Sequence, residues 1–219
     1  MNRIQVRVWG PLACFTRPEL KVERASYDLI TPSAAENLLS AIFWKPEIRY
    51  QVTEIHLLKP VQFTRLSRNE LKSRQMPDRG PLYITRDHTP RSSLILQDVE
   101  YIIKANVELQ PHATEGPGKY VGIFTERVQT GRSYHSPFLG LREFPAFFAP
   151  PTPEDYARTL PVTQDLGRML LRMRFDEDPQ GTFTFRKFGP DGGRTVRGRA
   201  TPLFFHASLE NGVLHVPER

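Results

Sequence analysis

The sequence contains very little cysteine and no long hydrophobic run. Cys14 is the single cysteine among 219 residues, which excludes an internal disulfide framework and a zinc site built from cysteines. No apolar run approaches the ~18 residues of a membrane span, and the N-terminal segment lacks the apolar core of a signal peptide. We therefore predict a cytoplasmic protein without a membrane segment.

The common catalytic motifs are absent as well. The sequence has no dinucleotide fingerprint, Walker A motif, nucleophile-elbow serine or metalloprotease helix. Its six histidines are scattered without the spacing of metal ligands. We therefore expect any catalysis to proceed with no metal and no other cofactor, and a metal site formed by His and Asp residues that meet only in the fold is the alternative.

What the sequence does contain is an excess of arginine. Lys and Arg total 30 against 24 Asp and Glu, a net charge of +6, and 23 of the 30 are Arg. Guanidinium groups bind phosphates and stack on bases, so nucleic acid is the leading partner class. Mild basicity is also common among bacterial proteins, and composition alone leaves the partner open.

The order of predicted elements up to residue 150 indicates an α+β fold. Alternating or one-sided apolar patterns predict strands over 3–9, 48–58, 94–109 and 138–148. Helices are predicted from Thr31-Pro32 to just before Pro46, and over 119–130 with a stop at Gly131. The resulting βαββαβ order is the ferredoxin-like (RRM-like) pattern, in which two helices cover one face of an antiparallel sheet.

The remaining segments are less regular. Residues 63–92 carry many arginines and no periodicity, which predicts a long functional or disordered loop. A linker is predicted over 151–164. Beyond it, short apolar runs are separated by turn sequences at 178–181, 190–193 and 211–212, as in hairpins. We therefore expect a ferredoxin-like domain over 1–150 and a small antiparallel β C-terminal domain over 151–219.

Two places suit the binding of RNA or another phosphate ligand. Trp44 and Lys45, at the end of the first predicted helix, could stack a base and bind a phosphate, although core packing of Phe43 and Trp44 is the alternative. Lys119 and Tyr120 follow a Gly/Pro turn at a helix N-terminus, where free N–H groups attract anions. A lysine there could stabilise a phosphorane, and a solvated lysine beside a core tyrosine is the alternative.

A third place suits proton transfer. His135 lies among polar, turn-forming residues close in sequence to several cations. The alternative is a structural or surface histidine. The neighbouring Arg142 and Glu143 are predicted to form an ion pair.

Several motifs, taken in order, resemble a known family. They include Gly10-x-x-Ala13-Cys-Phe, Thr31-Pro-Ser-Ala-Ala, Ile42-x-Trp44-Lys-Pro, Gly118-Lys, His135-x-Pro-x-Leu-Gly-x-Arg-Glu-Phe and Gly212-Val-Leu-His-Val-Pro. Each motif is weak alone, but the ordered set closely resembles CRISPR-associated protein five of the d subtype, in the RAMP superfamily. The resemblance extends over nearly the whole chain.

The resemblance implies a repeat-RNA-processing endoribonuclease of the type I-C system. Such a protein cuts the CRISPR repeat transcript 3′ of a stem-loop without a metal and keeps the guide's 5′ handle as a subunit of the interference complex. The substrate's own 2′-OH would be the nucleophile, so the protein must move two protons and stabilise the phosphorane. The basic charge also allows non-specific DNA binding.

The chain departs from the family's catalytic pattern at two of three positions. Phe43 replaces a tyrosine, and Tyr120, whose ordinary pKa is about 10, replaces a histidine. We predict Lys119, Tyr120 and His135 as catalytic residues of an active endoribonuclease, and a non-cleaving RNA-binding subunit is the alternative. The side chains predicted to bind RNA are Trp44, Lys45, Arg68, Arg127, Arg132 and Arg142.

Overall fold

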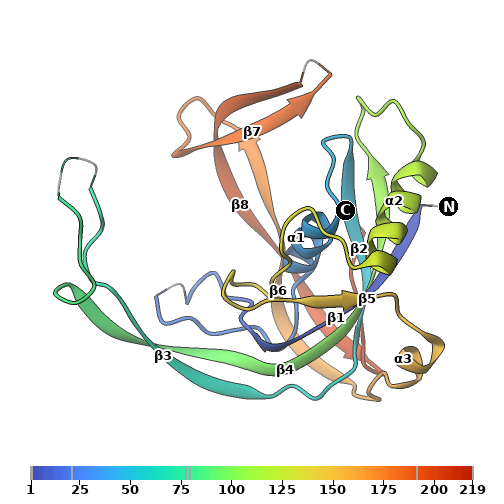
Figure 1. Cartoon of the computed structure of the whole chain (residues 1–219), viewed down its shortest axis with the longest axis horizontal. Coiled ribbons are helices and arrows are strands. Elements are labelled where there is room, and N and C mark those ends of the chain that lie inside the picture. The colour runs from blue at the N-terminus through green and yellow to red at the C-terminus, as the bar shows by residue number, and fades with distance from the viewer. Residues whose placement is uncertain (1, 21, 77, 79, 191, 219) are drawn as a thin grey trace.

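The computed structural model describes residues 2–20, 22–76, 78, 80–190 and 192–218 as one mixed α/β structure with an antiparallel sheet. The strand order is β5-β1-β4-β2-β9-β8-β6, with β3 paired to β4 and β7 paired to β8 (Figure 1). The strands are β1 (Arg3–Ala13), β2 (Ile48–Leu57), β3 (Phe63–Leu71), β4 (His88–Leu109), β5 (Phe147–Ala149), β6 (Gln164–Glu177), β7 (Phe183–Gly189), β8 (Gly192–Glu210) and β9 (Val213–His215). The helices are α1 (Pro32–Ile42), α2 (Pro117–Thr130) and α3 (Pro153–Ala157).

The predicted helices form where their capping signals are. The Thr31 side chain accepts a hydrogen bond from the N–H of Ala34, and α1 ends at Phe43, which is extended. Helix α2 begins after Gly116 and ends at Gly131, whose φ of 67° is left-handed. Lys119 and Tyr120 therefore lie in the first turn of α2, as predicted.

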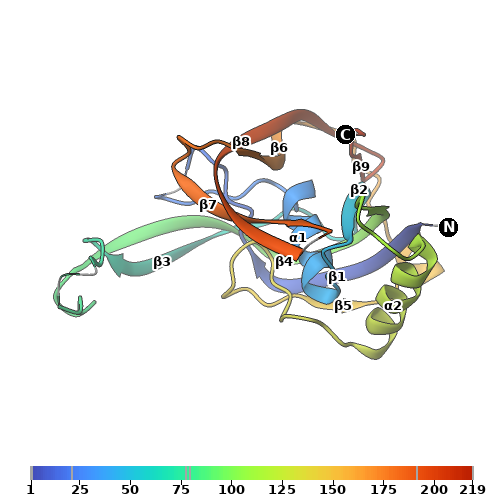
Figure 2. The same cartoon turned by 90° about the horizontal axis from the view of Figure 1, so that it is seen from above.

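The main core lies between the helices and the central strands. Val6, Val8, Ile103 and Ala105 point to the same side of β1 and β4 and are almost completely buried. Helix α1 contacts both β2 and β6, so the C-terminal strands curve around it (Figure 2). Burial of this apolar surface positions both helices relative to the sheet.

The prediction of a loop over residues 63–92 is wrong for both ends of the segment, which are strands, and holds for the described residues between 72 and 87. Strand β3 and the first half of β4 form a two-stranded arm that projects from the body, with Phe63 opposite Leu96 and Leu71 opposite His88 (Figure 1). Exposed and partly buried residues alternate along β3. Because many of them are charged or polar, the strand carries no apolar periodicity. Arg79, which belongs to this segment, lies outside the described residues.

The strand predicted over 138–148 is mostly a tight loop, and only Phe147–Ala149 pairs with β1. Gly140 has a φ of 83°, and a side chain there would overlap the carbonyl of Cys14. The N–H of Cys14 also donates to the carbonyl of Leu139 at 3.1 Å. This contact with the end of β1, together with Pro137 and Pro145, prevents a continuous ladder.

The predicted linker over 151–164 contains the short helix α3. Thr152 and Asp155 form a capping box, in which each side chain accepts from the other's backbone N–H. Asp155 is buried and also accepts from Arg7 at 2.7 Å and Arg158 at 3.1 Å. These bonds attach α3 to β1.

The C-terminal hairpins follow their predicted turns. Asn211 and Gly212 both have positive φ, 50° and 79°, as a two-residue hairpin turn between β8 and β9 requires. Gly181 and Gly192 lie at the other two turns, and Asp191 is outside the described residues. Strand β9 pairs with β2, which continues the N-terminal sheet into the C-terminal strands.

Candidate functional site

The N-terminal turn of α2 carries Lys119, a predicted catalytic residue. Its side chain is half exposed, and its Nζ donates to Glu115 at 2.8 Å. That hydrogen bond raises the pKa of Lys119, so the amine is a fixed positive charge at neutral pH. Gly116 offers no side chain to cap the helix, which leaves N–H groups of the first turn available to an anion.

Tyr120 lies beside Lys119 but points into the protein. It is buried against the core, and burial, followed by the charges of Glu47 and Glu115, raises its pKa. The hydroxyl therefore stays protonated at neutral pH, so Tyr120 can donate a proton but is a poor base. This environment matches the core-tyrosine alternative as well as a proton-donor role.

Two polar side chains near this turn were missed by the sequence analysis. The Glu47 backbone carbonyl accepts from the N–H of Gln110 at 2.8 Å, which fixes the loop before α2 next to the loop after α1. Among the described residues, Glu47 Oε2 and His112 Nε2 are buried without a hydrogen-bond partner. The sequence feature that could have pointed to Glu47 is its position directly after Trp44-Lys45-Pro46, a segment already predicted to bind RNA.

His135 lies at the other end of α2. At about 1.5 Å rise per residue, Lys119 and Gly131 are about 18 Å apart along the helix axis. The backbone N–H of His135 donates to the carbonyl of Ala41 at 2.9 Å, at the end of α1. The structure therefore does not bring His135 and Lys119 to one point.

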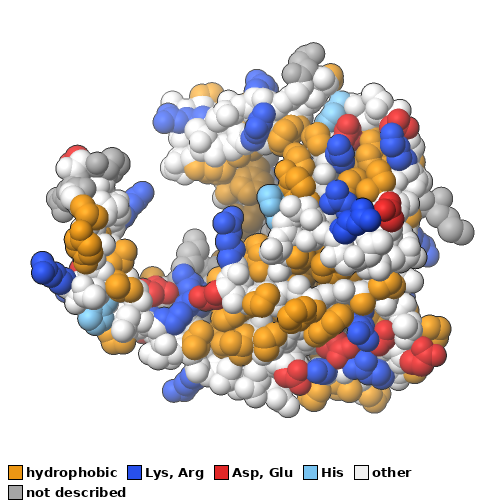
Figure 3. All heavy atoms as spheres, in the orientation of Figure 1, with side chains coloured by type: hydrophobic (Ala, Val, Ile, Leu, Met, Phe, Trp, Pro, Cys, Tyr) orange, Lys and Arg blue, Asp and Glu red, His pale blue; other side chains and the backbone are white. Residues whose placement is uncertain are grey.

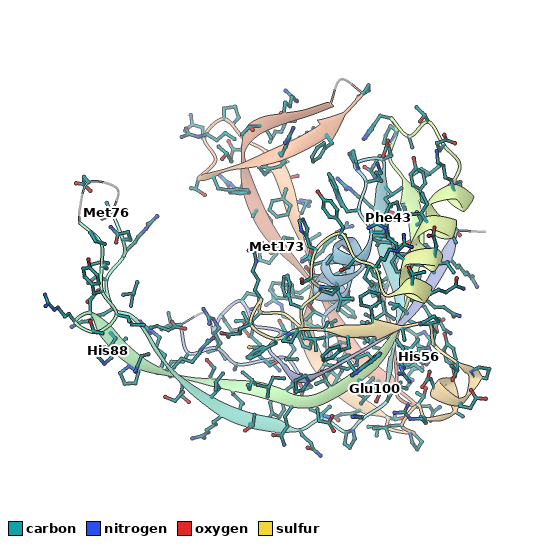
Figure 4. All side chains as sticks on the ribbon, viewed as in Figure 1. Phe43, His56, Met76, His88, Glu100 and Met173 are labelled. Carbon is teal, nitrogen blue, oxygen red and sulfur yellow. The ribbon has the colours of Figure 1, made fainter. Side chains whose placement is uncertain are left out.

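The predicted base-stacking residue Trp44 is partly exposed, whereas Phe43 is buried. Only 2% of the Phe43 surface is accessible, and the guanidinium of Arg127 lies 5.2 Å from its ring. Figure 4 shows Phe43 beside α2. Phe43 therefore packs in the core, as the alternative interpretation predicted. Trp44 is only partly buried, and Lys45 is exposed.

The four predicted RNA-binding arginines differ in their surroundings. Arg127 donates to the carbonyl of Ile42 at 2.9 Å and holds the two helix ends together. Arg68 pairs with Glu143 and, at 3.4 Å, with Glu70, at the base of the arm. Arg132 and Arg142 are exposed. The predicted pair of Arg142 with Glu143 is wrong, because the arm brings Arg68 to that carboxylate.

No group of three or more His, Cys, Asp or Glu side chains suited to a metal ion occurs in the described ranges. None of the helices in the part of the chain that the structure describes is long and apolar enough to cross a membrane. On the face shown in Figure 3, some of the basic side chains line an open hollow between the β3–β4 arm, the β6–β8 strands and the body, and others are spread over the body.

Comparison with known proteins identifies the class. Residues 3–217 match the family model described as CRISPR-associated protein (Cas5). A solved structure described as a CRISPR-associated protein superposes with a TM-score of 0.65 at 23% identity, covering 99% of this chain and 92% of that one. A functionally uncharacterised protein from Streptococcus mutans superposes with a TM-score of 0.62 at 21% identity, with the same coverage. These two structures share the fold.

Two curated relatives define the family more narrowly. Both are named CRISPR pre-crRNA endoribonuclease Cas5d. The protein from Thermus thermophilus is 46% identical over 218 residues, covering 99% of this chain and 92% of the relative. The protein from Mannheimia succiniciproducens is 37% identical over 235 residues, covering 99% and 95%. The chain belongs to the Cas5d family.

Proposed function

We propose that this protein is a metal-independent endoribonuclease that cuts CRISPR repeat precursor RNA 3′ of its stem-loop and then stays bound to the guide's 5′ handle in a type I-C interference complex. The observation that carries the proposal is the 46% identity, over 99% of the chain, to a relative named as a pre-crRNA endoribonuclease. The excess of arginine and the basic side chains that line the hollow support an RNA partner.

The strand order supports a ferredoxin-like N-terminal unit. β5-β1-β4-β2, with α1 joining β1 to β2 and α2 joining β4 to β5, is the antiparallel arrangement of a βαββαβ fold, and β3 is an addition to it. Strands β9, β8 and β6 would then form the C-terminal β extension. The proposed boundary lies between residues 150 and 151.

The first turn of α2 is the proposed site of cutting. Attack by the substrate's 2′-OH places extra negative charge on the phosphorus centre, and Lys119 with the free N–H groups of α2 would stabilise that charge. The attacking 2′-OH must lose a proton, which His135 would accept, and the leaving 5′-oxygen needs a proton, which Tyr120 would donate. His135 is the third candidate, and loop 131–137 would have to move toward Lys119 for it to act on the same phosphate.

The cutting reaction is tested with repeat RNA in excess EDTA, alongside RNA that carries a 2′-deoxy nucleotide at the scissile position. We expect the all-ribose RNA to be cut to a 2′,3′-cyclic phosphate and the deoxy RNA to stay intact. Tight binding without cutting of the all-ribose RNA would instead establish the alternative function, a non-cleaving structural subunit. Cutting of the deoxy RNA would overturn the 2′-OH mechanism.

The location of the site is tested with Lys119→Ala. Loss of a charge-stabilising group should slow cleavage about 100-fold or more at saturating RNA, with binding largely kept. Lys119→Arg, which keeps the charge, should retain more activity than Lys119→Ala. The matched control is Lys72→Ala, which removes the same charge from the exposed arm and should leave the rate at saturation unchanged. Equal rates for Lys119→Ala and the control would show that the site lies elsewhere.

The role of His135 has its own test. His135→Gln should slow cleavage at saturating RNA if the histidine transfers a proton, and its pH–rate profile should lose one limb. Full activity with an unchanged profile would assign proton transfer to another group. RNA binding is measured in parallel, so that a loss of affinity is not mistaken for a loss of chemistry.

A further inference from the structure

Three aromatic rings from distant parts of the chain form a continuous row, which we call the aromatic ladder. Trp44 follows α1, Tyr134 follows α2 and Phe188 lies in β7. The centroids of Trp44 and Tyr134 are 6.3 Å apart with 27° between their planes, and those of Trp44 and Phe188 are 5.3 Å apart with 64°. The ladder therefore joins both helix ends to the C-terminal hairpin.

The ladder is held by the backbone. The N–H of Tyr134 is shared between the carbonyls of Ala41 at 2.9 Å and Ile42 at 3.0 Å. Carbonyls at a helix C-terminus have no partner inside the helix, so the loop after α2 satisfies them. In this structure the backbone of Tyr134 is thus bonded to the end of α1, although 53% of the residue's surface is exposed.

Cations surround the rings. Lys45 adjoins Trp44 in sequence and is exposed, and Arg132 is exposed two residues before Tyr134. The guanidinium of Arg186, also on an exposed residue, lies 5.3 Å from the Phe188 ring. Tyr134 is exposed, and Trp44 and Phe188 are partly exposed. Accessible rings flanked by cations are typical of surfaces that bind single-stranded nucleic acid, in which bases stack and phosphates pair with the charges.

A docking surface for another protein is the main competing interpretation. An apolar protein interface has few charged groups at its centre. Here Arg186 packs directly on a ring of the ladder, and its charge complements a phosphate. The charges therefore favour RNA over an apolar protein partner.

We infer that the aromatic ladder of Trp44, Tyr134 and Phe188 stacks unpaired bases of the RNA, and that the β7–β8 hairpin is part of the RNA-binding site. The inference rests on the proposed function for the identity of the RNA. Unpaired nucleotides are the expected ligands, because bases within a stem are already stacked on one another. The ladder thus selects the single-stranded flank of the repeat.

The test measures the binding of repeat RNA made uncleavable by the scissile 2′-deoxy nucleotide. Tyr134→Ala and Phe188→Ala should each weaken binding about 5- to 150-fold, the range for loss of one base–aromatic stack. Tyr134→Phe keeps the ring and should bind like the unmodified protein. Phe147→Ala is the matched control, because Phe147 is a similarly exposed aromatic residue, with 52% accessible, and lies in β5, at the sheet edge away from the β7–β8 hairpin.

Abasic nucleotides, placed one at a time in the unpaired flanks, identify the stacking partner. At one position, removal of the base should weaken binding to the unmodified protein as much as Tyr134→Ala weakens binding of the intact RNA. The abasic RNA and the Tyr134→Ala protein together should show little further loss of affinity. Unchanged affinity for both alanine variants, or purely additive losses at every position, would overturn the inference. The melting temperature of each variant shows whether it is folded.

These outcomes are separable from a failure of the proposed function. If the unmodified protein binds repeat RNA but never cuts it, cleavage is refuted while the ladder is still tested by binding. If it binds no repeat RNA at all, both proposals fail. If the protein cuts the RNA, but the ladder variants change neither the affinity nor the response to abasic nucleotides, the inference about the ladder alone is refuted.

Discussion

Replacing Asp155 tests the ion-pair network that attaches α3 to the sheet. This carboxylate is 3% accessible and accepts hydrogen bonds from Arg7 at 2.7 Å and Arg158 at 3.1 Å. It also accepts from the N–H of Thr152 at 2.9 Å. Asp155→Asn keeps the size of the side chain and removes its charge, so the two guanidinium groups lose one of their two shared carboxylates and keep Glu100.

The expected cost follows from the burial of the pair. Removing one partner of a buried ion pair costs about 3–5 kcal/mol, and the half-exposed side chain of Arg158 places this network near the lower end, about 3 kcal/mol. For a chain of this size, each kcal/mol lowers the melting temperature by about 2–4 °C. We therefore expect Asp155→Asn to melt about 6–12 °C below the unmodified protein.

The pH dependence supplies a second readout. Burial by itself would raise the pKa of Asp155, but the hydrogen bonds from the Thr152 backbone and Arg7 outweigh it and lower the pKa. The stabilisation is therefore fully present above the unfolded-state pKa of about 4 and is lost as the pH falls through the folded-state value. The gap in melting temperature between the two proteins should accordingly close below about pH 4.

Thermal melts of both proteins from pH 3 to pH 8 make the comparison. Asp176→Asn is the control, because it removes an exposed carboxylate whose partner, Arg174 at 2.9 Å, is also exposed, so it should cost much less than Asp155→Asn. A loss below about 1 kcal/mol for Asp155→Asn at pH 7, or a gap that does not change with pH, would refute the reasoning.

Three further changes have defined outcomes. Gly140→Ala should cost at least about 2 kcal/mol in urea unfolding, because φ is 83° and the new methyl would overlap the Cys14 carbonyl; a near-neutral effect would contradict this. Glu115→Gln frees Lys119 and should bind RNA about twofold more tightly at low salt, a gain that titrations at high salt should not show. Burial lowers the pKa of His56, so the unmodified protein should lose stability as pH falls below about 6.5, and His56→Gln should reduce that loss in thermal melts.

Capping and turn residues in the sequence were sufficient to predict where several helices and hairpins begin or end. Thr31-Pro32, Gly131 and Asn211-Gly212 each fix a backbone conformation through capping or positive φ, and each boundary lies where the sequence places it. The arm could not be found in this way. Its strands lack a continuous apolar face, and apolar periodicity is the signal by which a strand is predicted.

Long-range packing limits what sequence can establish about the site. Lys119 and Tyr120 could be placed in one helical turn, because their spacing is local. The position of His135 depends on hydrogen bonds from its loop to the end of α1, and no spacing rule predicts such contacts. The same holds for Phe188, which meets Trp44 only because β7 and β8 extend toward the end of α1.

Helix α2 separates the two proposed RNA contacts. Lys119 lies at its first turn, and Tyr134 follows its C-terminal cap, so the rigid helix, about 18 Å from Lys119 to Gly131, fixes the distance between the phosphate to be cut and the stacked base. Charge stabilisation at Lys119 does not depend on which base is present. Stacking depends on it only weakly, because every base has a flat aromatic face. On these assignments, the cut position is determined by the distance from the stacked nucleotide, and the sequence around the scissile bond contributes little. Recognition of the repeat then depends on the length of its unpaired flank between the stacked nucleotide and the cut.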